Sequence, residues 1–109
     1  MDARHPAWLV QLLLPLRDND GRPYPRAVFD RVRDELTERF GGVTAYLRAP
    51  AQGAWKDDED DAVARDDVVT IEVMADALDR AWWARWRARL EQALQQKEIV
   101  VRASAIERL

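Results

Sequence analysis

The sequence lacks cysteine, and it holds a single histidine and a single serine. Without cysteine there is no disulfide bond, no thiolate metal site and no cysteine nucleophile, and the chain suits a reducing compartment. His5 lies near the N-terminus and Ser104 in the last predicted strand, so neither a Ser-His-Asp triad nor a multi-histidine metal site is expected. The few glycines form no phosphate-binding loop. We therefore expect neither a metal nor a cofactor.

An excess of basic charge and a long apolar run are also missing. Lys and Arg number 17 against 20 Asp and Glu, a net charge of −3. Phosphate binding normally needs a concentrated basic face, so no nucleic-acid partner is expected. The most apolar stretch, Ala7–Leu16, is interrupted by Gln11 and Pro15 and is too short to span a bilayer as a helix. No small-residue cleavage site follows it. We read it as a buried strand and expect a cytoplasmic protein without a membrane partner.

The 109 residues, 48% hydrophobic and 34% charged, are typical of one globular domain covering residues 1–109. The first predicted strand is a near-continuous apolar run, as in a strand covered on both sides. Later strands alternate apolar and polar residues, as in strands with one buried face. The four predicted strands are Trp8–Leu14, Val43–Ala49, Val68–Met74 and Ile99–Ser104. Ala105–Leu109 is read as a tail.

Two segments predict amphipathic helices. The first starts at Pro25, whose missing N–H costs nothing in a first helical turn, and stops at Gly41 and Gly42. The second is capped by Asp76 or Asp79 and runs to about Gln96. Its tryptophans, which recur at helical spacing, are read mainly as core, with at least one ring reaching the helix edge. These tryptophans are Trp82, Trp83 and Trp86.

The resulting order, β-α-β-β-α-β, predicts an α+β fold of the ferredoxin-like kind. Two right-handed β-α-β units give a four-stranded antiparallel sheet with both helices on one face. The first and third strands are expected in the middle of the sheet.

Strand parity leaves the other sheet face open. Its polar members are Gln11, Thr44, Tyr46, Arg48, Thr70, Glu72 and Arg102, and its apolar members are Leu9, Leu13, Val68, Met74 and Val100. A monomer seldom exposes so much apolar area beside so few charges. We expect a homo-oligomer closed through this face, or a small molecule bound against it. Arg48 and Glu72 on adjacent strands also suit a plain cross-strand ion pair.

The ligand-binding candidates are Gln11, Tyr46, Arg48, Trp55, Glu72 and Arg102. Trp55 follows Gly53 on a predicted loop, where it can fold over the open face, anchor a subunit contact or cover one end of the core. The acidic run Asp57–Asp61 lacks the ligand spacing and glycine of an EF-hand, so a solvated loop is favoured over a calcium site.

The stretch Phe40–Trp55, FGGVTAYLRAPAQGAW, carries a resemblance. It is similar to small bacterial proteins of ferredoxin-like α+β type, which have an F-x-G-x-T strand followed by a G-x-W loop. The similarity covers Phe40–Leu94 best and brings no established activity. The wider architecture resembles dimeric α+β barrel proteins, which include cofactor-independent monooxygenases and small-ligand-binding modules.

Three functions follow as hypotheses. We favour a small oligomeric module that is structural or binds a small ligand. The alternative is a cofactor-independent enzyme of the dimeric α+β barrel type. Its site would consist of Tyr46, Arg48, Trp55 and Glu72, with Glu72 or Tyr46 as acid or base and Arg48 holding an anionic substrate. A nucleic-acid or regulatory partner binder using the arginines of the second helix conflicts with the acidic charge balance.

Overall fold

The computed structural model describes residues 5–48 and 68–109, with the side chains of 6–43 and 68–109. These residues form strands and helices in the order β1, α1, β2, β3, α3, β4. The strands are β1 (His5–Pro15), β2 (Val43–Arg48), β3 (Val68–Ala75) and β4 (Val100–Arg108). The helices are α1 (Arg26–Phe40) and α3 (Arg80–Leu94). Neither of these helices is long and apolar enough to cross a membrane.

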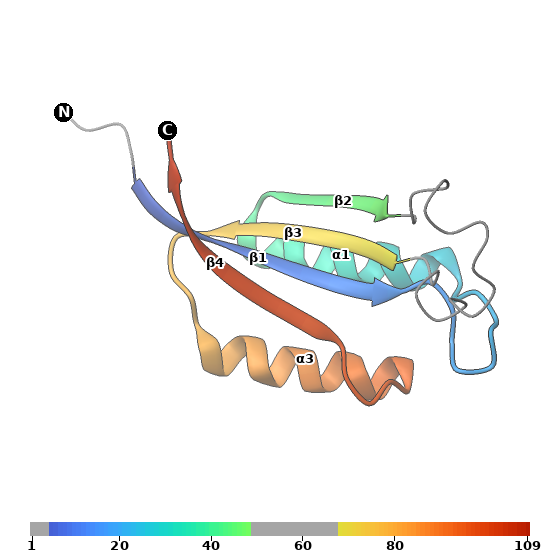
Figure 1. The fold of residues 1–109 in the computed structure, drawn as a ribbon. Helices are drawn as coiled ribbons and strands as arrows, with labels where there is room; N and C mark the ends of the chain where they lie inside the picture. The colour runs from blue at the N-terminus through green and yellow to red at the C-terminus, as the bar shows by residue number, and fades with distance from the viewer. Residues whose placement is uncertain (1–4, 49–67) are drawn as a thin grey trace, which may run out of the picture.

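The strands form one antiparallel sheet in the order β2-β3-β1-β4 (Figure 1). β1 pairs with β3 from Trp8↔Ala75 to Pro15↔Val68, and with β4 from His5↔Arg108 to Leu13↔Val100. A strand with neighbours on both sides needs apolar residues on its core face. β1 supplies them, since Val10, Leu12 and Leu14 are at most 1% exposed.

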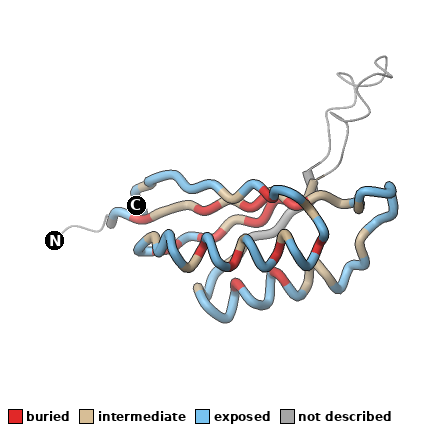
Figure 2. The backbone as a smooth tube through the Cα atoms, turned by 90° about the horizontal axis from the view of Figure 1, so that it is seen from below, coloured by how far each residue is buried: buried red, intermediate tan, exposed pale blue. Residues whose placement is uncertain are grey.

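Both helices lie on the same side of the sheet (Figures 1 and 2). A single core contains residues of both helices and of the central strands. From α1 it takes Val32 and Leu36, and from α3 it takes Trp83, Trp86, Leu90 and Leu94. The apolar stripe of each helix is therefore buried against one sheet face, as amphipathic helices require.

The helix ends follow local chemistry. α1 begins after Pro25 and ends at Gly41. Gly41 has a φ of 91°, a conformation that glycine adopts with little steric strain because it has no Cβ atom. α3 begins at Asp79, whose carboxylate accepts a hydrogen bond from the Trp82 N–H. The helix positions predicted from the sequence are confirmed, and Asp79 is the cap of α3.

The C-terminal end of α3 has no glycine. Gln95 takes the left-handed conformation instead, with φ 56°. The last carbonyls of a helix need outside donors. The Tyr24 hydroxyl donates to the Leu94 carbonyl oxygen at 2.7 Å, and the Asn19 amide donates to the Gln95 carbonyl oxygen at 2.9 Å. The loop before α1 thus closes the end of α3.

The predicted fold has to be corrected in the make-up of its sheet. The ferredoxin-like prediction ended the last strand at Ser104 and made Ala105–Leu109 a tail, but β4 runs on to Arg108. β1 likewise starts at His5 rather than Trp8. No glycine or proline interrupts Ala105–Arg108, so nothing in that stretch stops the strand. Pro6 is tolerated in β1 because the β3 ladder begins only at Trp8, which leaves one side of Pro6 unpaired by β3.

The two helices meet through a cluster of Phe40, Trp82, Trp83 and Trp86, called here the tryptophan cluster. Phe40 stacks on Trp83 with ring centroids 5.2 Å apart, and Trp82 stacks on Trp86 at 6.0 Å. Trp83 and Trp86 are buried, whereas Trp82 is half-buried. The prediction that these residues are mainly core, with one ring at the helix edge, is confirmed.

Candidate functional site

Three of the predicted ligand-binding residues lie in one row across the open sheet face. Gln11 on β1 is opposite Glu72 on β3 and opposite Arg102 on β4. The Gln11 Nε2 donates to a Glu72 carboxylate oxygen at 2.7 Å, and the Arg102 Nε donates to the Gln11 Oε1 at 3.0 Å. The amide of Gln11 therefore joins a carboxylate to a guanidinium on the neighbouring strands. We call Glu72, Gln11 and Arg102 the polar row.

A second charged pair lies toward the end of the same face. Arg108 Nη1 of β4 is 3.1 Å from Asp76 Oδ1, which directly follows β3. The register places Ala7 of β1 between these two flanking segments, opposite Ile106. Ala7 is only 2% exposed. Sequence reasoning missed this pair because it ended the last strand too early.

The open face has a charge polarity. Glu72 and Asp76 belong to the β3 side, and Arg102 and Arg108 belong to the β4 side. β1 runs between the two sides and contributes the neutral Gln11. Among the charged side chains of this face named here, those on the β3 side are acidic and those on the β4 side are basic.

Apolar side chains flank the polar row. Met74 is 45% exposed and Val100 is 44% exposed. Leu9 and Leu13 of the central strand are half-buried. The predicted mixture of apolar and polar residues on this face is therefore present among the described residues. Thr70 is the exception to the expected exposure, since it is 1% exposed and its Oγ1 has no hydrogen-bond partner within the described chain.

The register does not place Arg48 directly opposite Glu72, as the sequence led us to expect. The side chain of Arg48 is not among those described, so an ion pair between the two residues stays a prediction. Glu72 is opposite Thr44, and Arg48 is opposite Val68 at the far end of the β2–β3 ladder. The two predicted partners are separated by four positions of β3, too far for directly opposed side chains. The expected direct opposition failed because the alternation of side chains along a strand predicts the sheet face of a residue, but does not predict which residue lies opposite it on the next strand.

The other predicted positions have side chains, or whole residues, that the structure does not describe. The backbone of Tyr46 pairs with Thr70, while the side chains of Tyr46 and Arg48 are not among those described. Trp55 and the acidic run Asp57–Asp61 lie outside the described residues. Their proposed roles remain predictions.

Two of the cavities that the described residues form on the helix side are lined in part by core side chains of α3. One, of about 230 Å³, lies between the helices and is lined by apolar residues with Arg31, Glu35 and Arg89 among them. The Glu35 carboxylate there accepts the Trp86 indole N–H at 3.1 Å. The other, of about 190 Å³, lies between α3 and the sheet and includes Trp83 and Arg87. The Trp83 indole nitrogen is buried without a hydrogen-bond partner among the described residues.

Comparisons with known proteins bring no further assignment. No family model, no curated protein and no solved structure matches this chain. The function therefore has to be argued from the residues themselves.

The described side chains of the open face place two charged groups and one amide in a row. A carboxylate, an amide and a guanidinium are held in fixed order by hydrogen bonds, and such charge-assisted bonds are stronger than neutral ones. Glu72 and Gln11 are half-buried, and Arg102 is exposed. The row can therefore present a carboxylate and a guanidinium to a molecule that lies on the face.

Proposed function

We propose that this protein is a small oligomeric module, structural or ligand-binding, that associates with a second copy of itself through the open sheet face. The observation that carries this proposal is the pairing of exposed Met74 and Val100 with a polar row whose members already hydrogen-bond one another. Polar groups that keep partners within their own chain reduce the cost of excluding water from the face. Covering the apolar side chains then favours association.

The contrast between the two sheet faces supports this choice. One face is covered by α1 and α3, which bury Val10, Leu12 and Leu14 of β1 and Ile71 and Val73 of β3. The other face has half-buried Leu9 and Leu13 on the central strand, a position that usually carries the best-buried residues of a sheet. A second copy of the chain would cover the open sheet face, as the two helices cover the other face. A cytoplasmic location, expected from the composition, belongs to the same proposal.

The described residues give the enzyme alternative little support. Of the residues predicted for it, Tyr46, Arg48, Trp55 and Glu72, only Glu72 has a described side chain. Within the polar row, Glu72 is engaged by Gln11. A hydrogen bond from Gln11 to Glu72 is compatible with ligand binding, and it does not identify Glu72 as a catalytic acid or base.

The test is sedimentation velocity of the wild-type chain over a range of protein concentrations, with Val100→Lys as the disrupting variant. Val100 is exposed on the open face, so a lysine there is expected to shift the chain toward monomer without unfolding it. The matched control is Ala27→Lys, an exposed position on α1. A wild-type chain that stays monomeric at several hundred micromolar contradicts the proposal.

Native mass spectrometry distinguishes the two versions of the module. A dimer without additional mass supports the structural version. An adduct that is lost in Arg102→Ala supports the ligand-binding version, because Arg102 is the exposed cation of the polar row.

A further inference from the structure

The charge polarity of the open face restricts how two copies can meet. Acidic Glu72 and Asp76 lie on the β3 side of β1, and basic Arg102 and Arg108 lie on the β4 side. In a twofold interface the same surface serves both copies, so that residue i contacts residue j and residue j contacts residue i. The arrangement of charges therefore decides which twofold axis is favourable.

Two face-to-face arrangements illustrate the choice. If the twofold axis runs across the strands, the β3 sides of both copies lie together, and Glu72 faces Glu72 while Arg102 faces Arg102. If the axis runs along β1, the β3 side of each copy lies over the β4 side of the other copy. Glu72 of each copy then faces Arg102 of the other. Like charges facing each other cost several kcal/mol at an interface. The second arrangement removes that cost and replaces it with attraction.

We propose that two copies pack with their β1 strands over each other, about a twofold axis parallel to β1, with reciprocal ion pairs between Glu72 and Arg102. This inference rests on the proposed self-association. In this arrangement Gln11 lies at the centre, opposite the Gln11 of the second copy. The exposed Asp76 and Arg108 extend the same exchange of charges toward the N-terminal end of β1. Aligned packing of two sheets keeps their strands within about 30° of each other, which is compatible with this axis.

The same geometry predicts the size and strength of the contact. The overlap is limited to β3, β1 and β4, because β2 lies outside β3 and projects beyond the partner's β4 edge. With strands about 4.8 Å apart and about 3.3 Å per residue, the overlap covers roughly 400 Å² of each copy. Both copies together then bury about 800 Å², which is below the range of stable interfaces and within that of weak, transient contacts. We therefore expect a weak dimer that dissociates as salt is added, since the charges at its rim are screened.

The experiment uses charge reversals that can be recombined. Glu72→Arg places an arginine opposite Arg102 of the second copy, and Arg102→Glu places a glutamate opposite Glu72. Each variant alone is expected to weaken dimerisation at least tenfold. Mixed in equal amounts, the two variants restore both ion pairs between unlike chains. Sedimentation equilibrium at low salt is expected to show a heterodimer of wild-type strength.

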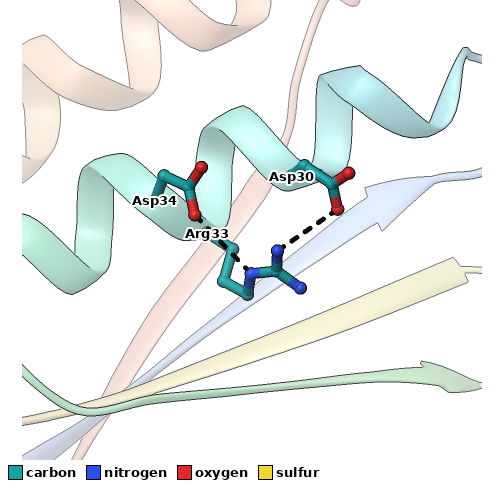
Figure 3. Close-up of polar contacts among 3 residues, drawn as sticks. All are labelled: Asp30, Arg33 and Asp34. Atoms are coloured by element: carbon teal, nitrogen blue, oxygen red, sulfur yellow. Dashed lines mark ion pairs between the residues drawn. The ribbon is translucent and has the colours of Figure 1, made fainter.

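The controls change the same charges on the opposite side of the molecule. Arg33 on α1 lies 3.4 Å from Asp30 and 3.8 Å from Asp34, and all three are solvent-exposed ion-pair partners (Figure 3). Asp34→Arg and Arg33→Glu are expected to leave dimerisation unchanged. If Glu72→Arg does not fold, as judged by circular dichroism, the same design is applied to Asp76→Arg and Arg108→Asp. Asp76 is 86% exposed and Arg108 is 48% exposed, so their replacement leaves the core intact.

The outcomes separate this inference from the proposal on which it rests. A monomeric wild type overturns both. A wild-type dimer that both single variants leave unchanged overturns the axis along β1 and keeps the self-association. A dimer weakened by each single variant and restored in the mixture supports the reciprocal pairs. Weakening without restoration in the mixture also overturns them.

Discussion

The two faces of β1 both carry leucine side chains, and these lie in different surroundings. On β1, Leu12 and Leu14 point to the helices and are fully buried, whereas Leu9 and Leu13 on the other face are half-buried. The helix-covered face is filled by side chains of α1 and α3. On the open face a hydrogen-bonded polar row crosses the strands. The burial of the leucines of β1 is therefore decided by which face the helices cover, because the residue type is the same on both faces.

The largest test of this comparison is Leu12→Ala against Leu13→Ala. The two neighbours carry the same side chain on opposite faces, and Leu12 is 0% exposed. Leu12→Ala leaves a cavity in the core and is expected to lower the free energy of unfolding by about 3 kcal/mol. The change at Leu13 is expected to cost about 1 kcal/mol in the monomer, because less contact is lost. Urea denaturation at low protein concentration measures both. Equal losses at the two positions contradict the difference between the faces.

A second test addresses the polar contact on the helix-covered side. Trp86→Phe removes the indole N–H that bonds Glu35 at 3.1 Å and leaves space beside a residue that is 3% exposed. We expect a loss of about 2 kcal/mol in the free energy of unfolding. Glu35→Gln keeps an acceptor in place and serves as the control, with a smaller loss. If Trp86→Phe is as stable as the wild type, the contact does not contribute to holding the helices together.

The smallest effect is expected at the edge of the molecule. Asp79→Ala removes the cap of α3 and is expected to cost about 1 kcal/mol, while Asp79→Ser retains a capping oxygen and restores most of it. Asp76→Asn removes the charge from a pair that is largely solvent-exposed, and is expected to change stability by less than about 0.5 kcal/mol. Thermal unfolding ranks the three variants. A larger loss for Asp76→Asn than for Asp79→Ala would reverse the expected order.

Much of the local structure could be read directly from short-range patterns. Pro25, Gly41 and Asp79 mark helix ends through their own backbone preferences or capping chemistry, so α1 and α3 were located nearly to the residue. Trp83 and Trp86 were placed in the core by helical spacing. What failed was the end of β4, where no local signal separates a continuing strand from a tail.

The sequence predicted which residues of the candidate site share one sheet face. It did not predict which of these residues contact one another. Alternation along each strand places Gln11, Glu72 and Arg102 on one side, because successive side chains point in opposite directions. It does not say which residues stand opposite one another. The same reasoning therefore proposed Arg48 for Glu72, where the register gives Thr44.

The sequence by itself determined the elements, the apolar stripes and the sidedness of each strand, since these depend on neighbours a few residues away. Only the tertiary structure decided the register of the strands and the separation of charge about β1. Those properties depend on segments far apart in the chain, such as Gln11 and Arg102, whose hydrogen bond spans 91 positions. The polar row exists because backbone pairing aligned three strands, and no single strand specifies that alignment.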